Sequence, residues 1–208
     1  MSWRWPVAVR HELPDGRRLS LRPLERADRA AWEALRRRNE DWLRPWESTA
    51  PGEASRTLPF PQLRRVLDRG AKDGLILPFV IDVDGEIVGQ IQLFDVLWGA
   101  RRSGWAGYWL DQEATGRGVA TWALAALVDH VLLEAGLHRV EVAIRPENTA
   151  SLAVAARLRL PEEGTQRGLM HVDGQWADHR LFAIVVEDLR RGGYAQGGLV
   201  PLLHGRAG

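Results

Sequence analysis

The chain has 208 residues, of which 45% are hydrophobic and 26% charged, and 28 basic against 27 acidic side chains leave a formal net charge of +1. The length predicts one ordinary domain, and the charge balance predicts that it lacks the basic field of a nucleic-acid-binding protein. The absence of cysteine excludes disulfides, thiolate metal sites and a cysteine nucleophile. No apolar run approaches the ~18 residues of a membrane span and no signal-peptide core is found, so we expect a cytoplasmic protein.

The first elements predicted along the chain are a strand and a helix. Residues 17–24 alternate polar and apolar side chains as a half-buried strand does, and residues 27–38 carry apolar side chains at helical spacing. Residues 40–65 contain four prolines and predict a short helix and a mobile loop, in which Trp42 and Trp46 lie one helical turn apart.

The middle of the chain predicts a hairpin followed by a strand and a long helix. The β-rich runs 75–83 and 86–94 flank Asp84-Gly85, and Asp-Gly between such runs is the strongest local signal for a hairpin. Residues 103–110 then read as a strand, and residues 119–133 read as a helix that ends at a glycine.

The last predicted elements are a strand, a helix and a second hairpin. Residues 138–145 alternate as a strand, and residues 148–158 read as a helix with an asparagine cap. The segments 164–172 and 176–186 are joined through Asp173-Gly174, again a hairpin signal.

This order of elements predicts an α+β fold with one central, mixed but mostly antiparallel sheet flanked by helices. We expect an N-terminal extension at 1–16, a folded domain at 17–188 and a Gly-rich C-terminal tail at 189–208. The tail is expected to fray, although its apolar run 199–203 could dock on a partner.

A Gly-rich turn lies between the strand 103–110 and the long helix. The turn reads Thr115-Gly116-Arg117-Gly118-Val119-Ala120. Two glycines leave room for a phosphate, and the free N–H groups of the first helical turn favour an anion. The alternative is a tight turn in which the glycines only supply unusual φ values.

The segments around this turn resemble a known family. Gly107-Tyr108-Trp109-Leu110-Asp111 precedes the turn, and His138-Arg139-Val140-Glu141 and Arg145-Pro146-Glu147-Asn148-Thr149-Ala150-Ser151 follow it. Together they resemble the GNAT superfamily of acetyl-CoA-dependent N-acetyltransferases, and within it the RimJ/RimL branch, which acetylates the N-termini of ribosomal proteins. The resemblance covers residues 17–188 and implies the GNAT fold.

The resemblance implies roles for individual residues. The turn 115–120 is expected to bind the CoA pyrophosphate, and Tyr108, Trp109 and Leu110 the pantetheine, with amides near Leu110 polarising the acetyl carbonyl. Asn148 is expected to contact the cofactor, and Ser151 to lie near the thioester sulfur and protonate the departing thiolate. The alternatives are a plain helix cap for Asn148 and a first-turn hydroxyl for Ser151.

The chain departs from the family pattern at several positions. The turn opens with Thr115 where Gln or Arg is usual, and the tyrosine that serves many relatives as general acid falls at Ala155. The positions of two carboxylates used by relatives read Trp105 and Met170. A Gly-Phe pair that commonly closes the helix reads Arg159-Leu160.

Other groups then remain as candidate bases. These are Glu47, Glu141, Asp95, His171 and His179, each of which could instead be solvated or ion-paired. No metal-ligand spacing occurs, so no metal is expected.

The sequence therefore predicts an N-acetyltransferase that uses acetyl-CoA. The expected acceptor is the N-terminal α-amine of a protein such as a ribosomal protein, attacked directly in a ternary complex, with Trp42 and Trp46 on one wall of the substrate cleft. The alternatives are a small-molecule acetyltransferase acting on an amino acid, polyamine or antibiotic, and a non-catalytic acetyl-CoA-binding protein. No nucleic-acid or membrane partner is expected, and the chain is expected to be a monomer or homodimer.

Overall fold

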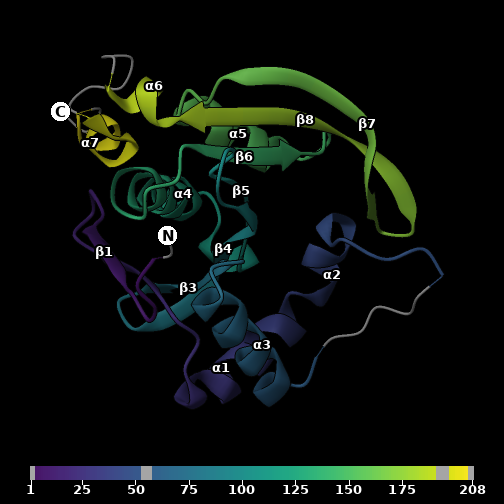
Figure 1. Cartoon of the computed structure of the whole chain (residues 1–208). Helices are drawn as coiled ribbons and strands as arrows, with labels where there is room; N and C mark the ends of the chain where they lie inside the picture. The colour runs from purple at the N-terminus through teal and green to yellow at the C-terminus, as the bar shows by residue number, and fades with distance from the viewer. Residues whose placement is uncertain (1–2, 53–57, 191–196, 206–208) are drawn as a thin grey trace.

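An eight-stranded sheet organises the structure (Figure 1). The computed structural model describes residues 3–52, 58–190 and 197–205. The strand order is β1-β2-β3-β4-β5-β6-β8-β7, and all neighbours are antiparallel except β5 and β6. The strands are β1 (Val9–Glu12), β2 (Arg18–Arg22), β3 (Leu77–Val83), β4 (Glu86–Leu97), β5 (Ser103–Leu110), β6 (Arg139–Ile144), β7 (Glu162–Val172) and β8 (Gln175–Val185). The predicted α+β fold with a mixed, mostly antiparallel sheet is confirmed.

Helices connect and cover these strands. The α-helices are α1 (Arg29–Arg38), α2 (Glu40–Leu43), α3 (Phe60–Lys72), α4 (Val119–Asp129), α5 (Thr149–Arg157), α6 (Val186–Arg190) and α7 (Leu199–His204). The short 3₁₀ segments are η1 (Arg26–Asp28), η2 (Arg44–Trp46) and η3 (Gln112–Ala114), and the π-helical turn η4 (His130–Glu134) extends α4. Within the described residues, no helix is long and apolar enough to cross a membrane.

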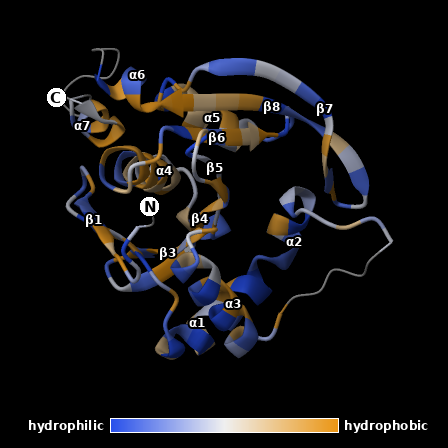
Figure 2. Ribbon diagram, viewed as in Figure 1, coloured by the Kyte–Doolittle hydropathy of each residue, from blue (hydrophilic) through white to orange (hydrophobic). Residues whose placement is uncertain are grey.

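The two faces of the sheet are covered by different hydrophobic clusters. On one face, α4, α5 and α7 pack over the sheet, and nine of the eleven residues of α4 are buried. Figure 2 shows α4 as mostly hydrophobic, as expected of a helix surrounded by protein. On the other face, Trp32 and Leu35 of α1 and Phe60 of α3 pack against Val80 and Ile87.

Both predicted hairpin turns are present. Asp84 and Gly85 have φ values of +53° and +93°, and Asp173 and Gly174 have +46° and +83°. Positive φ at both central residues is the geometry that a two-residue hairpin loop requires, and Asp-Gly adopts it at low cost. Local sequence therefore determines these two connections.

Helix α3 was not predicted. Residues 40–65 were expected to form a short helix and a mobile loop. The short helix is present as α2, but α3 begins within the expected loop at Phe60, with Pro61 in its first turn. A proline is tolerated there because the N–H groups of the first turn have no partner within the helix. Its apolar side, which includes Leu63 and Leu67, packs on the cluster beneath α1. Residues 53–57 of the expected loop lie outside the described residues.

The N-terminal segment that contains Trp3 and β1, and the C-terminal helix α7, both pack against the rest of the fold. β1 pairs with β2, and the buried indole of Trp3 donates a hydrogen bond to the carbonyl of Ala71 (2.9 Å). The expectation that the C-terminal stretch frays is wrong for residues 197–205, since α7 packs on α4 of the same chain. Residues 191–196 and 206–208 lie outside the described residues, and the domain boundaries at 17 and 188 stay a prediction.

The α7 helix is attached to α4 through a carboxylate. Asp129 accepts hydrogen bonds from the N–H groups of Leu199 (2.8 Å) and Val200 (2.9 Å), which are the first residues of α7. Burial raises the pKa of Asp129, and these two hydrogen bonds oppose the rise. A six-residue helix is not stable alone, so this cap and the burial of its apolar side chains explain why it forms.

Candidate active site

The sheet opens between its two parallel strands. In the described part of the chain only three residue pairs join β5 and β6, the last being Trp105↔Glu141. β5 nevertheless continues to Leu110 and β6 to Ile144. The two strands therefore diverge beyond Trp105, and the sheet is interrupted at its centre.

The backbone of β5 faces this opening at Leu110. Asp111 donates its N–H to the carbonyl of Val88 (2.7 Å), so Asp111 belongs to a hydrogen-bonded pair with β4. Such pairs alternate along an antiparallel ladder, which makes Gly89↔Leu110 a non-hydrogen-bonded pair. The N–H of Leu110 therefore points away from β4 and into the opening, where a ligand can accept from it.

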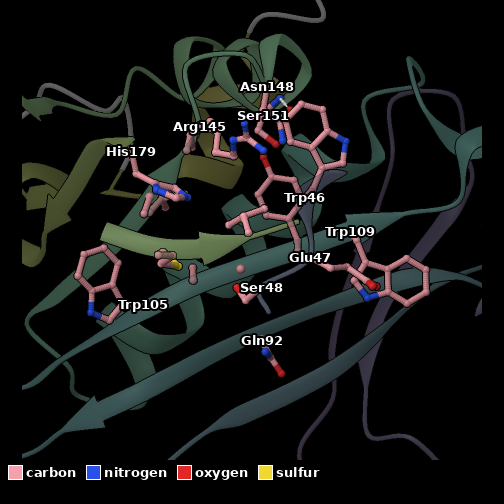
Figure 3. A pocket seen from close by; sticks show the side chains of 18 of the residues that line it. Trp46, Glu47, Ser48, Gln92, Trp105, Trp109, Arg145, Asn148, Ser151 and His179 are labelled. Carbon is pink, nitrogen blue, oxygen red and sulfur yellow. Dashed lines mark hydrogen bonds between the residues drawn. The ribbon is translucent and has the colours of Figure 1, made fainter. Parts of the chain in front are cut away.

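A cavity of about 510 Å³, which we call the aromatic cavity, opens on the face of the sheet that carries α1 and α2. Its aromatic side chains are Trp46, Phe94, Trp105, Tyr108 and Trp109. Its polar and charged side chains include Glu47, Gln90, Gln92, Arg145 and His179. Figure 3 labels seven of these side chains around the cavity: Trp46, Trp105, Trp109, Glu47, Gln92, Arg145 and His179. The volume lies in the range of small-molecule sites.

A second cavity, of about 300 Å³, lies at the N-terminus of α4, and we call it the turn cavity. Its wall includes Thr115, Gly116, the start of α4 and one side of α5. Trp42 lines this cavity and not the aromatic one, whereas Trp46 lines both. Arg117 does not line it, and its carbonyl accepts a hydrogen bond from Arg17 (3.4 Å).

The turn before α4 has the geometry of an anion site. Gly116 and Gly118 have φ values of +75° and +77°, and Gly118 is the N-cap of α4 with no side-chain cap. The N–H groups at Val119 and Ala120 therefore meet the cavity without a capping carboxylate or hydroxyl. Orphan N–H groups and the helix dipole at this end attract phosphate.

The two cavities meet at a small set of shared residues. Those that line both are Leu43, Trp46, Tyr108, Trp109, Asn148 and Ser151. A molecule in the turn cavity and a molecule in the aromatic cavity would therefore touch each other beside Tyr108 and Ser151. In Figure 3 Ser151, Asn148 and Trp46 lie together at one end of the pocket.

Two buried hydroxyl groups in the wall of the turn cavity are not satisfied by hydrogen bonds of normal geometry to the described residues. They belong to Tyr108 and Thr121 and are inaccessible to solvent. Burial raises the pKa of Tyr108 to about 12, and the neighbouring Ser151 hydroxyl opposes only part of this rise. Tyr108 is therefore a neutral donor near pH 7. Buried polar groups normally find partners, so these hydroxyls favour a bound polar ligand.

Asn148 and Ser151 occupy the first turn of α5. The side chain of Asn148 caps the helix by accepting a hydrogen bond from the N–H of Ser151 (3.0 Å). This is the structural alternative expected for Asn148, and it coexists with the position of Asn148 in both cavity walls. The cap fixes Ser151, whose side chain lies where the two cavities meet.

The two predicted carboxylates have different environments. Glu47 lines the aromatic cavity but is paired with Arg36. Glu141 is buried, pairs with Arg139 (3.0 Å) and does not line either cavity. The exposed Asp95 is also outside both cavities. The structure thus brings only Glu47 of these three to the site.

The predicted histidines also differ. The ring of His171 forms a hydrogen bond with the hydroxyl of Thr49 (2.7 Å), away from the cavity wall. His179 lines the aromatic cavity, is 4% exposed, and its Nδ1 lies 3.0 Å from the carbonyl oxygen of Ala177. Burial lowers the pKa of His179, and the nearby Arg145 guanidinium lowers it further, while the hydrogen bond to Ala177 opposes this.

The segment after η2 closes the aromatic cavity by joining the β7–β8 hairpin. Ser48 forms an isolated β-bridge with Val172, and the N–H of Thr49 donates to the carbonyl of His171 (2.8 Å). Arg145 adds a third contact by donating to the carbonyl of Pro45 (2.9 Å). These contacts hold Trp46 and Glu47 above the opening of the sheet.

Several cavity residues were not predicted from the sequence. Gln90 and Gln92 lie on the same face of β4, and Gln90 accepts a hydrogen bond from the indole of Trp109 (3.2 Å). Polar residues at alternate positions of an otherwise buried strand could have indicated them. Arg145 belonged to a recognised segment, but its position in the cavity depends on where β6 ends. Trp105 and Met170, at the positions where the resemblance to the family predicts carboxylates, also line this cavity.

Comparisons with known proteins agree with this geometry. Residues 18–160 match the acetyltransferase (GNAT) domain family. The structure is similar to Mycobacterium smegmatis RimJ in complex with CoA-disulfide, with a TM-score of 0.89 and 38% identity over 99% of this chain and 97% of that chain. The ribosomal protein uS5-alanine N-acetyltransferase of Escherichia coli (strain K12) is 29% identical over 77% of this chain and 85% of that protein. The Probable N-acetyltransferase YjcK of Bacillus subtilis (strain 168) is 28% identical over 83% of this chain and 97% of that protein.

Proposed function

The chain belongs to the acetyltransferase (GNAT) domain family and is an N-acetyltransferase of the GNAT type, and from this premise we propose that it acetylates the N-terminal α-amine of a protein such as a ribosomal protein. The acetyl donor is acetyl-CoA, and the amine attacks it directly in a ternary complex.

The observation that carries this proposal is the meeting of two cavities at Ser151 and Tyr108. A direct transfer requires the donor and the acceptor to be bound at the same time with their reacting atoms in contact. The turn cavity and the aromatic cavity adjoin at the opening between β5 and β6, and they share only six lining residues. The chain has no cysteine that could carry the acetyl group between them.

The residues of the turn cavity fit CoA. The uncapped first turn of α4 would hold the pyrophosphate, and the N–H of Leu110 would donate to the pantetheine arm or to the acetyl carbonyl. The unpartnered hydroxyl of Thr121 offers one more donor, and Arg157 also lines the wall. When bound, acetyl-CoA supplies an acetyl group activated as a thioester.

The protein's own groups then have separate tasks. The N–H groups near Leu110 stabilise negative charge on the carbonyl oxygen, and the hydroxyl of Ser151 protonates the departing sulfur directly or through water. Tyr108 lies beside Ser151 and, being neutral near pH 7, can donate to it. Trp46 covers this position and limits access of water from the α2 side.

The choice of an α-amine follows from acid–base chemistry. A protein α-amine has a pKa of about 7.7–8.0 and a lysine side chain about 10.4, so near pH 7 roughly a tenth of the former and under a thousandth of the latter are neutral. A site in which Trp105 and Met170 lie where the resemblance to the family predicts carboxylates suits the amine that needs less help. The relative that acetylates ribosomal protein uS5 at alanine supports the same class of acceptor.

The test compares acceptors in the presence of acetyl-CoA. Short peptides with a free N-terminal Ala or Ser, the same peptides with a blocked N-terminus and one lysine, and spermidine are incubated separately while free thiol is measured. We expect the free peptides to react about 100-fold faster or more than the blocked peptides, with mass spectrometry locating the acetyl group on the α-nitrogen.

Two other results would contradict the proposal. Efficient acetylation of the blocked peptides or of spermidine alone would indicate a lysine or small-molecule acetyltransferase. Acetyl-CoA binding without thiol release in the presence of any of these amines would indicate a non-catalytic acetyl-CoA-binding protein. Binding of acetyl-CoA by itself does not distinguish between these functions.

A further inference from the structure

The aromatic cavity contains one unassigned group that can accept a proton. An attacking amine must lose a proton as it forms the new N–C bond, and a positioned base accelerates this step. Of the carboxylates predicted for this role, Glu47 is bound to Arg36, and Glu141 is bound to Arg139 outside the cavity. Neither is free to take a proton from an acceptor in the cavity.

His179 is held in the form that a base requires. Its Nδ1 faces the carbonyl oxygen of Ala177 at 3.0 Å, and a carbonyl oxygen can only accept, so Nδ1 carries the hydrogen. Nε2 then carries the lone pair. His179 is almost fully buried in the wall of the aromatic cavity, on β8, which continues the sheet beside β6. Figure 3 shows it on the same side of the pocket as Arg145 and Ser151.

The charges around His179 favour its neutral form. Burial is the main reason that its pKa is lowered, and Arg145 at the end of β6 lowers it further. Two carboxylates act in the opposite direction: Glu147, which is 63% exposed and pairs with Arg145 (3.3 Å), and Asp178, which accepts a hydrogen bond from the N–H of Gly168 (2.7 Å). Across the cavity, Glu47 is neutralised by Arg36. The imidazole is therefore ready to accept a proton near pH 7.

We propose that His179 is the general base of the acetyl transfer, a role that rests on the proposed function of the site. Its Nε2 takes the proton of the amine while the amine nitrogen forms its bond to the acetyl carbon. The bond between that carbon and sulfur breaks, and the sulfur leaves with its electron pair and gains a proton through Ser151. The imidazolium then releases its proton to solvent. The net reaction converts one amine and one thioester into one amide and one thiol.

The experiment uses two substitutions that separate chemistry from structure. Asn in His179→Asn can still donate from its amide to the carbonyl of Ala177 but has no atom equivalent to Nε2. Gln in His179→Gln extends an amide toward the position of Nε2 but cannot act as a base. His138→Gln is the matched control, because His138 is half-exposed and pairs with Glu187 away from both cavities.

The expected result is a loss of turnover without a loss of binding. Both variants of His179 should lower kcat for a free N-terminal peptide by about 100-fold or more, the usual contribution of a general base, while the affinity for acetyl-CoA and the His138→Gln activity stay unchanged. Below about pH 6.5 wild-type kcat should fall more steeply with decreasing pH than kcat of His179→Gln. Only the wild type loses its base when His179 gains a proton, whereas both enzymes depend on the ionisation of the amine.

Chemical rescue of a third variant tests the role of His179 without relying on either amide substitution. His179→Gly should regain kcat when imidazole is added, in proportion to the neutral imidazole concentration, and a structural role would not respond in this way. A kcat within about threefold of wild type in both amide variants, an unchanged pH profile, or no rescue by imidazole would each overturn the assignment. Failure of wild-type protein to acetylate any peptide would instead contradict the proposed function.

Discussion

Replacing Gly118 by glutamate tests whether the turn before α4 binds a pyrophosphate. Gly118 has a φ of +77°, and a side chain in this left-handed region costs about 1–2 kcal/mol. An added Cβ would lie 3.8 Å from the nearest atom, on Trp122, which is ordinary van der Waals contact. The fold should therefore persist, with a melting temperature lower by roughly 2–8 °C for a chain of this size.

The affinity for CoA should fall much more than the stability. A glutamate side chain at this position starts where the N–H groups of Val119 and Ala120 face the turn cavity. Losing one charge-assisted hydrogen bond costs about 1.5–3 kcal/mol, which corresponds to a roughly 10- to 150-fold larger dissociation constant for CoA. Repulsion between the carboxylate and the pyrophosphate weakens binding further.

Gly85→Glu is the matched control, measured with Gly118→Glu by calorimetric titration of CoA and by thermal unfolding. Gly85 has a φ of +93° in the β3–β4 turn, and an added Cβ would have no atom within 4 Å. It lines neither cavity of the site. We expect a similar loss of melting temperature and an unchanged affinity for CoA. Undiminished affinity in folded Gly118→Glu would refute the assignment of the turn.

Four further predictions concern kinetics and stability. Initial-rate lines at varied amine should intersect because no cysteine can hold the acetyl group, and parallel lines with an isolable acetyl-enzyme would contradict direct transfer. Ser151→Ala should lower kcat more than it raises KM for acetyl-CoA, and an unchanged kcat would leave Ser151 a structural residue. Asn148→Ala should weaken acetyl-CoA binding and lower the free energy of unfolding by about 1 kcal/mol in a urea titration, since it removes the cap of α5; full stability would contradict this. Arg145→Met should raise the pKa of His179, so the acidic limb of kcat moves to higher pH; an unmoved limb would show that the two groups are not coupled.

Much of the fold could be predicted because its signals are local. The two Asp-Gly turns adopt positive φ at both positions, Asn148 caps α5, and α4 is apolar on nearly all sides. Each of these features depends on residues within a few positions of one another. The resemblance of the segments around the Gly-rich turn to a known family then predicted how the strands and helices are arranged in the fold. The glycines at 116 and 118 also have the backbone conformation that the turn predicts.

The elements that were not predicted depend on contacts with distant parts of the chain. Residues 199–204 are too few for a stable helix, and α7 exists because Asp129 caps it and α4 buries its apolar side chains. β1 needs β2 as a partner, and α3 needs the cluster beneath α1. Local propensity contains none of this information, because the stabilising partner is elsewhere in the sequence.

The sequence by itself determined the two hairpin turns, the order of most strands and helices, the turn before α4 and the absence of a thiol nucleophile. Only the tertiary structure decided which side chains meet at the site. The divergence of β5 and β6 places Tyr108 beside Ser151 and leaves the N–H of Leu110 without a strand partner. The pairing of Glu47 with Arg36, and the burial of His179 against the cavity, likewise arise between segments far apart in the chain. Proton affinity depends on burial and on neighbouring charges, and these are fixed by packing rather than by residue type.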